Sequence, residues 1–165
     1  MEEGKVADRA LPPGDSRRLT PGEIELVQSV FGAAVNCEKV RIFRRKYFPF
    51  QPRRTTMAPN GNVYFPARSP LYRDDFAEAG RYLQGLFMHE MTHVWQHQRG
   101  INVWRAVFDR RYRYRLQRGK AFAAYGLEQQ CEIVRDWFLG KSDSAPGERE
   151  MYAEVLPFGG ASRNV

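Results

Sequence analysis

One short stretch carries residues whose types and spacing suit hydrolytic chemistry. It reads His89-Glu90-Met91-Thr92-His93, the pattern His-Glu-x-x-His (HExxH). In a helix, His89 and His93 lie one turn apart on the same face, so both imidazoles can reach one metal ion. Glu90 is offset by one residue, close enough to take a proton from a metal-activated water. The stretch predicts a zinc site with Glu90 as general base, provided that the chain supplies a third ligand.

His97 is the first candidate for the third ligand, because it continues the series begun by His89 and His93. A helical segment of that length spans about 12 Å, whereas two ligands of one zinc ion lie about 3–4 Å apart. His97 would reach the metal only if the helix broke, and residues 94–97 (Val-Trp-Gln-His) contain no glycine for such a break. We therefore expect His97 to lie away from the metal.

A later stretch, Gly126 to Asp136, offers carboxylates at helical spacing. Glu128 and Glu132 are separated by one helical turn and share a face. Glu128 can bind the metal, and Glu132 can accept a hydrogen bond from the free ring nitrogen of a ligand histidine, which fixes the tautomer. An amphipathic helix with a solvated acidic face is the alternative interpretation of these residues.

These candidate ligands need helices and a scaffold to hold them. The Thr20-Pro21-Gly22-Glu23 capping box begins one expected helix. Residues 101–120 are ambiguous, since 101–108 can form a short helix while 112–116 alternate like a strand. Periodicity and turn residues predict the following elements: helices over 20–31, 76–98, 127–139 and 147–155, and strands over 40–44 and 62–65.

Composition sets the class of protein. Hydrophobic residues make up 42% of the chain, with 11 Phe, 8 Tyr and 3 Trp, so we expect a folded core. The chain has only two cysteines, Cys37 and Cys131, which excludes a zinc ribbon and a disulfide framework. We interpret both as reduced and at least partly buried thiols, with a single bridge between them as the alternative.

The N-terminal residues MEEGKVADRALPPGDSRR are polar and lack the apolar segment of a signal peptide. No apolar run approaches the ~18 residues that span a bilayer. We expect no membrane association and a cytoplasmic location, although secretion without an N-terminal signal would leave no trace here. The formal net charge of +7 favours anionic partners or, alternatively, reflects solvated arginine faces.

Taken together, the motifs resemble a known family. The pairing of His89, Glu90 and His93 with Glu128 and Glu132 resembles gluzincin-type metallopeptidases, which combine HExxH on one helix with a glutamate on a second. The stretches NGNVYF (60–65), HEMTHVWQHQ and YGLEQQCEIVRDWF are similar to small bacterial HExxH proteins described as Vgr-related, a label tied to secretion-system spike genes. The resemblance implies Zn²⁺ held by His89, His93 and Glu128.

The resemblance also implies the fold. We expect the α+β class, as a minimal zincin-like domain in which a small mixed sheet packs on the HExxH helix and on a second, glutamate-bearing helix. The chain divides into a flexible N-terminal arm (1–19), the zincin-like metallopeptidase domain (20–140) and a C-terminal tail with a short helix (141–165). In the resembling peptidases an edge strand pairs with extended substrate, and the strand over 62–65 is the candidate here.

A zinc-dependent peptidase that hydrolyses peptide bonds is the favoured function. Such chemistry needs a group that stabilises the oxyanion. Tyr125 is the candidate nearest in sequence to Glu128, and its alternatives are Tyr112, Tyr114, Tyr152 and nearby arginines.

Two other functions stay open. One is a non-catalytic zincin-fold interaction or adaptor protein linked to a secretion system. The other is a DNA-associated, SprT-like protease, because residues 105–120 are basic with interleaved aromatic residues. The four-cysteine ribbon of many such proteases is missing. The expected partners are a peptide or protein substrate and a Vgr-type secretion-system protein, with nucleic acid ranking below both.

Overall fold

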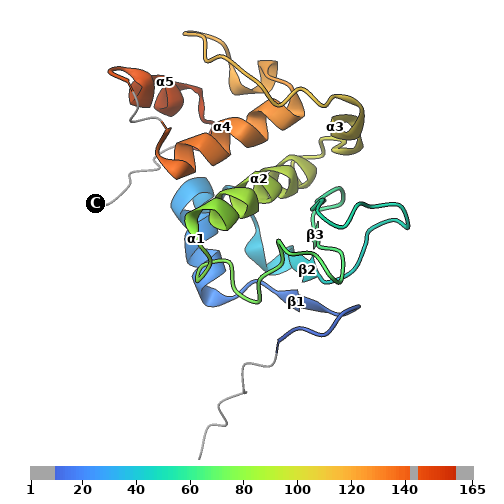
Figure 1. The fold of residues 1–165 in the computed structure, drawn as a ribbon. Helices are drawn as coiled ribbons and strands as arrows, with labels where there is room; N and C mark the ends of the chain where they lie inside the picture. Colours follow the sequence, from blue (N-terminus) through green and yellow to red (C-terminus); the bar gives the residue numbers. More distant parts are fainter. Residues whose placement is uncertain (1–9, 142–144, 159–165) are drawn as a thin grey trace, which may run out of the picture.

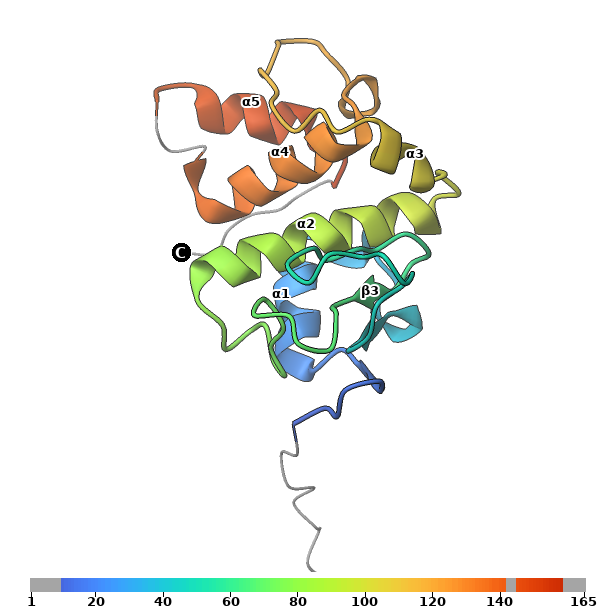
Figure 2. The same ribbon diagram turned by 45° about the vertical axis from the view of Figure 1, so that its right-hand side comes forward.

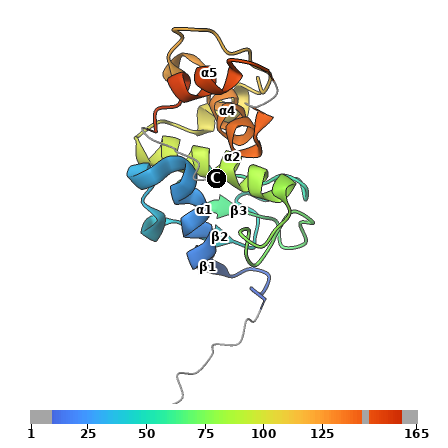
Figure 3. The same cartoon turned by 90° about the vertical axis from the view of Figure 1, so that its left-hand side faces the viewer.

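The helix α2 (Arg81–Gln98) lies in the middle of the molecule. A small sheet and α1 (Pro21–Phe31) lie on one side of α2, and α4 (Leu127–Leu139) and α5 (Glu148–Val155) lie on the other (Figures 1 and 3). This arrangement comes from a computed structural model, which describes residues 10–141 and 145–158. The α+β class expected from the sequence is confirmed.

The sheet has three short strands, β1 (Ser16–Arg18), β2 (Arg41–Phe43) and β3 (Val63–Tyr64). The central strand β2 runs antiparallel to β1 and parallel to β3, so the sheet is mixed, as predicted. In register, Ile42 lies opposite Arg17 in β1 and opposite Val63 in β3. Ile42 and Val63 are fully buried, which directs one face of the sheet toward the core.

The strand β1 corrects one expectation, because its residues fall within the range 1–19 that the sequence predicted as a flexible arm. The guanidinium of Arg17 donates two hydrogen bonds of 2.8 Å to Glu23, a buried residue of α1 that also accepts from the N–H of Phe76. This buried ion pair and the pairing with β2 hold the segment. Residues 1–9 lie outside the described residues.

The helices otherwise follow the predicted ranges closely. The capping box of α1 is present, with Thr20 and Glu23 exchanging hydrogen bonds of 2.9 and 3.1 Å. The helix α4 ends at Gly140, whose φ of 80° suits a glycine cap. The shorter elements are α3 (Trp104–Phe108) and the 3₁₀ turns η1 (Gly32–Ala34), η2 (Cys37–Lys39) and η3 (Phe122–Ala124).

One predicted boundary differs in the structure, and one ambiguous segment is resolved. The helix predicted from residue 76 begins only at Arg81, because Glu23 and Asp75 accept the N–H groups of Phe76 and Ala77 and hold this segment in a turn. Residues 112–116, which the sequence left ambiguous although they alternate like a strand, do not form a strand, since no other strand pairs with them among the described residues.

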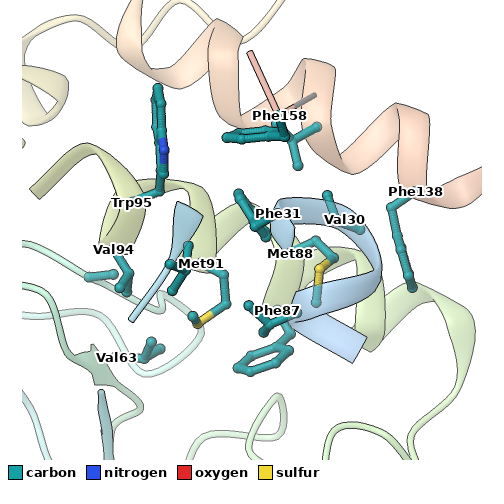
Figure 4. Packing of buried hydrophobic residues seen from close by; sticks show 14 of the residues in the cluster. Val30, Phe31, Val63, Phe87, Met88, Met91, Val94, Trp95, Phe138 and Phe158 are labelled. Atoms are coloured by element: carbon teal, nitrogen blue, oxygen red, sulfur yellow. The ribbon is translucent and has the colours of Figure 1, made fainter. Parts of the chain in front are cut away.

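The core surrounds α2 on both sides, which explains why this helix is buried almost all round between residues 87 and 96. Figure 4 shows Met91 and Val94 directed toward Val63 of the sheet. On the other side, the rings of Trp95 and Phe158 lie 5.2 Å apart. Residues 87–96 are therefore buried, and any polar side chain among them must find a partner inside the protein.

Two sequence expectations concern single features of the fold. Both cysteines are free thiols, Cys131 buried and Cys37 half-buried, as expected. Within the described part of the chain, no helix combines the length and apolarity needed to cross a membrane.

Candidate metal centre

The candidate site lies between α2 and α4, which pack along much of their length (Figure 2). The Nε2 atoms of His89 and His93 both face Glu128, at 3.1 and 3.4 Å from its Oε2 atom. One turn of α2 separates the histidines, and Glu128 follows the N-terminus of α4 at Gly126. All three side chains are buried. The packing of the two helices thus brings together the three ligands proposed from the sequence.

The second ring nitrogen of His89 faces another carboxylate. Its Nδ1 atom lies 2.8 Å from Oε1 of Glu132, one turn after Glu128 on α4. Arg135 in turn lies 3.5 Å from the same carboxylate oxygen. The arrangement directs Nε2 of His89 toward Glu128 and holds the ring plane, which is the role that the sequence proposed for Glu132.

The second ring nitrogen of His93 is held by a chain of buried amides. Nδ1 of His93 lies 2.9 Å from Oε1 of Gln96, and Nε2 of Gln96 donates to Oε1 of Gln130 at 2.9 Å and to the Leu127 C=O at 3.1 Å. Nε2 of Gln130 donates to the C=O of Tyr125 at 2.9 Å. Because a backbone carbonyl can only accept, the NH₂ group of Gln130 must face Tyr125, which leaves its Oε1 atom to accept from Gln96. Gln96 then presents its own Oε1 atom to His93, so Nδ1 of His93 must be the donor.

The distances suit a bound metal ion. Two ligands about 2.0–2.1 Å from a tetrahedral ion lie about 3.3 Å apart. The separations of 3.1 and 3.4 Å from Glu128 Oε2 to the two imidazoles fall on either side of that value. His89, His93, Glu128 and Cys131 form a buried group whose ligand atoms lie within 4.8 Å of one another, so the group could hold an ion.

Cys131 is the member of this group that the sequence did not suggest. Its Sγ atom lies 3.4 Å from Nδ1 and 3.6 Å from Nε2 of His93, so it packs beside the ring rather than in line with one nitrogen. Burial raises the pKa of the Cys131 thiol well above its usual value, which favours the neutral thiol when no metal is bound. The sequence did carry a signal for Cys131, because a residue one helical turn after Glu128 lies on the same face of the helix.

Glu90 is buried beside this group, with 4% of its surface exposed. Its Oε2 atom has no hydrogen-bond partner among the described residues. Burial raises the pKa of Glu90, and the charges of His89 and His93 oppose the shift. A buried carboxylate oxygen without a partner is costly, which indicates that a ligand of the site, such as water or a substrate group, completes its contacts.

When no metal ion is bound, a proton on His89 supplies positive charge at the site. Burial alone would lower the pKa of His89, but hydrogen bonds to Glu128 and Glu132 and the charge of Glu90 raise it to about 10. Burial alone would raise the pKa of Glu128, but hydrogen bonds from His89 and His93 lower it to about 2. The metal-free centre is therefore an ion pair between an imidazolium and a carboxylate.

The tyrosines differ in their relation to the site. The hydroxyl of Tyr125 accepts a hydrogen bond from the N–H of Gln117 at 3.0 Å, and the side chain is buried. Tyr112 is 46% exposed, and its ring lies at 6.4 Å and 26° to the imidazole of His89. Burial and the negative charge of Glu128 raise the pKa of Tyr112. Tyr112 is thus the tyrosine whose ring lies beside a candidate ligand.

His97 lies outside the metal group. It is exposed, and its ring lies against Gly61, where the Cβ of any larger residue would come within 2.7 Å of the His97 Cδ2 atom. Gly61 also has a φ of 83°, so this turn needs a glycine for both reasons. The helix α2 continues unbroken to Gln98, which is why His97 points elsewhere.

The strand β3 does not offer the free edge expected for substrate. Met57 and Tyr64 exchange two main-chain hydrogen bonds, of 2.8 and 3.2 Å. Nε2 of Gln51 also donates to the C=O of Tyr64, at 3.2 Å. The expectation that this strand pairs with an extended substrate is therefore wrong at Tyr64, because the chain itself occupies those groups.

Known proteins resemble the chain both in sequence and in fold, although no protein-family model matches it. The chain is 42% identical over 136 residues to the type VI secretion system spike protein VgrG2b of Pseudomonas aeruginosa, covering 77% of the chain but only 13% of that protein. The solved structure of the effector domain of Pseudomonas aeruginosa VgrG2b superposes with a TM-score of 0.71 at 39% identity, covering 88% of this chain and 86% of that domain. The chain therefore belongs to the family of the VgrG2b effector domain.

Proposed function

We propose that the chain is a zinc-dependent peptidase that works as an effector domain of a type VI secretion system. One observation carries the proposal: two imidazole nitrogens and a carboxylate converge at 3.1 and 3.4 Å, and beside them lies buried Glu90, whose Oε2 atom has no partner in the described part of the chain. The similarity in sequence and fold to the VgrG2b effector domain supports the link to secretion.

The donor set supports zinc as the metal. Two neutral imidazoles and one carboxylate, with a position left for water, are the ligands of catalytic zinc in proteins. His89, His93 and Glu128 would hold the ion, and Glu132 and Gln96 would keep the two rings in place. When bound, zinc polarises the substrate carbonyl and makes water acidic enough to lose a proton near neutral pH.

Glu90 performs the proton transfers in this proposal. Its raised pKa makes it a stronger base than an exposed carboxylate, so it accepts a proton from the attacking water. It then passes the proton to the amine that leaves when the peptide bond breaks. Burial keeps bulk water away from this carboxylate and strengthens its interaction with the positive charge of the site.

Tyr112 is the tyrosine that we assign to the substrate carbonyl. Its exposed hydroxyl-bearing ring lies beside His89, whereas the hydroxyl of Tyr125 is engaged with the Gln117 backbone. Tyr125, the candidate preferred from the sequence, instead supports the site through its C=O, which ends the amide chain from Gln96 and Gln130 to His93.

A non-catalytic interaction module linked to secretion is the second candidate. The similarity to a spike protein favours it, because that similarity concerns the secretion system and says nothing of hydrolysis. Buried Glu90, whose Oε2 atom has no hydrogen-bond partner among the described residues, distinguishes the two functions. A purely structural metal site gains nothing from this carboxylate and bears the cost of burying it.

The test combines metal content with cleavage. Purified protein is analysed for zinc and incubated with unfolded proteins, with and without chelator, alongside Glu90→Gln and the matched surface variant Glu25→Gln. We expect one zinc per chain in all three proteins and a loss of cleavage of at least about a hundredfold in Glu90→Gln alone. Full cleavage by Glu90→Gln, or a wild-type protein without zinc, would refute the proposal. Zinc without any cleavage would favour the interaction module.

A further inference from the structure

The segment that follows α3 is stretched along α4 (Figure 2). At one end, the side chain of Asp109 lies against Gly126: its Oδ2 atom is 3.2 Å from the position that a Cβ atom on Gly126 would occupy. At the other end, the hydroxyl of Tyr114 donates a 2.7 Å hydrogen bond to Asp136. From 126 to 136 the helix rises about 15 Å. No turn or bend interrupts residues 109–117, and an extended chain from 109 to 114 spans a similar distance at about 3.3 Å per residue.

Side chains alternate along this segment as they do in a strand. Tyr114 and Leu116 are half-buried, while Arg113 and Arg115 between them are exposed. The hydroxyl of Tyr114 is anchored to Asp136 and to the hydroxyl of Tyr152, at 2.7 and 2.6 Å. The residues thus have the pattern predicted for a strand, but the described residues contain no strand beside it.

One edge of the segment is open. In an extended chain, the N–H and C=O of one residue point to one edge and those of the next residue to the other. The C=O of Arg113 accepts a 2.7 Å hydrogen bond from Gln129 of α4, so the edge shared by Arg113 and Arg115 faces the helix. Within residues 10–141 and 145–158, the main-chain groups of Tyr112 and Tyr114 have no hydrogen-bond partner.

The open edge passes the candidate metal centre. Tyr112 packs beside His89, and a cavity of about 650 Å³ is lined by residues of the segment together with Glu132, Asp136 and Glu148. Of these carboxylates, Glu132 is paired with Arg135 and Asp136 with Lys141. A polypeptide paired with this edge would run beside the zinc ligands. The edge of β3 lacks this capacity at Tyr64, where Met57 is already paired.

The exposed side chains define the chemistry of the partner. Arg110, Arg113 and Arg115 are exposed and form no ion pair within the described part of the chain. Arg113 and Arg115 lie on one side of the extended segment, so acidic side chains at alternate positions of a paired strand would meet them. An extended polypeptide with carboxylates fits both the open main chain and the charge.

We propose that the segment Arg110–Leu116 docks an extended, acidic stretch of the substrate as an added β-strand, a role that rests on the proposed peptidase function. The main chain of Tyr112 and Tyr114 supplies the hydrogen bonds, which accept any sequence. Arg113 and Arg115 supply the preference for acidic side chains.

Binding is measured on zinc-loaded Glu90→Gln protein, in which no peptide is expected to be cleaved. A failure of docking can then be distinguished from a failure of catalysis. The probes are two fluorescent libraries of short peptides, with Glu or with Lys at alternate positions. We expect the acidic library to bind about tenfold more tightly, from two exposed ion pairs. Adding Arg113→Glu and Arg115→Glu should abolish or invert the preference. The charge-matched control, Arg18→Glu with Lys39→Glu at exposed positions of β1 and η2, should keep it.

Hydrogen exchange of the backbone amides supplies the second measurement. The acidic library should slow exchange in residues 110–116 and leave that of β3 unchanged. Equal exchange with and without peptide, or an acidic preference that survives the Arg113 and Arg115 reversal, would overturn the proposal. The proposal would also be overturned if the acidic peptides did not bind while labelled single-stranded DNA did, and if the Arg113 and Arg115 reversal removed that DNA binding. Binding of acidic peptides without cleavage by the wild type would sink the peptidase function and leave docking standing.

Discussion

Replacing Gln96 by leucine tests whether the buried amide chain positions a metal ligand. Gln96 is fully buried on α2, accepts from Nδ1 of His93, and donates to Gln130 and to the Leu127 C=O. Leucine has a similar volume but can neither donate nor accept. The substitution therefore removes the hydrogen bonds while largely keeping the packing of the helix.

The magnitude follows from the partners left behind. Two buried groups, Nδ1 of His93 and Oε1 of Gln130, lose a partner at about 1–3 kcal/mol each, so the metal-free protein should lose at least about 2 kcal/mol of unfolding free energy. The His93 ring also becomes free to rotate and to change tautomer. Loss of such an orienting contact typically weakens metal binding about 10- to 100-fold, or about 1.4–2.7 kcal/mol.

The assay is zinc affinity by competition with a chromophoric chelator, together with urea unfolding of the metal-free protein. The matched control is Gln84→Leu on the same helix, where a half-buried glutamine makes one hydrogen bond, to the C=O of Ala77. We expect this variant to bind zinc as the parent does. Folded Gln96→Leu protein with parental zinc affinity would refute the assigned role of the amide chain.

The remaining predictions concern the centre itself. Glu128→Ala should lose zinc binding in the chelator competition, and parental affinity would exclude Glu128 as a ligand. The protonated His89 should stabilise the metal-free fold fully below its ordinary pKa of 6.5 and progressively less as the pH rises through about 10. The thermal midpoint of metal-free protein should fall between those values, while zinc uptake near neutral pH should release one proton, measured by calorimetry in two buffers. Cys131→Ser should keep one metal per chain, and the cobalt-substituted parent should lack a thiolate charge-transfer band. Tyr112→Phe should lower kcat about a hundredfold with zinc retained, whereas Tyr125→Phe should lower stability by about 1 kcal/mol and leave kcat unchanged.

Several features could be predicted because their physics is local. Helical periodicity placed α1, α4 and most of α2, and the capping box of Thr20 and Glu23 follows from three residues of separation. The same local geometry put His89 and His93 on one face and directed His97 away from them. The boundary of α2 was predicted too early because its cause is distant: Glu23 accepts the N–H of Phe76.

Other features depend on which segments meet, and no local pattern encodes that. The strand β1 exists because Arg17 reaches Glu23 and because β2 lies beside it. Gln96 and Gln130 look like ordinary polar positions until α2 and α4 close over them. The alternation of residues 112–116 was real, but a strand needs a neighbour, and the fold supplies none among the described residues.

The sequence by itself determined which candidate ligands share one face of each helix. The helical repeat fixes this, because residues three or four apart in HExxH and ExxxE lie one turn apart on the same side. Only the tertiary structure decided how the two faces meet. It placed one oxygen of Glu128 between two imidazoles and paired β3 with Met57 at Tyr64. Within residues 10–141 and 145–158, it also left Oε2 of buried Glu90 and one edge of the 110–116 segment without hydrogen-bond partners. These outcomes depend on long-range packing and on desolvation, which exist only once the chain has folded.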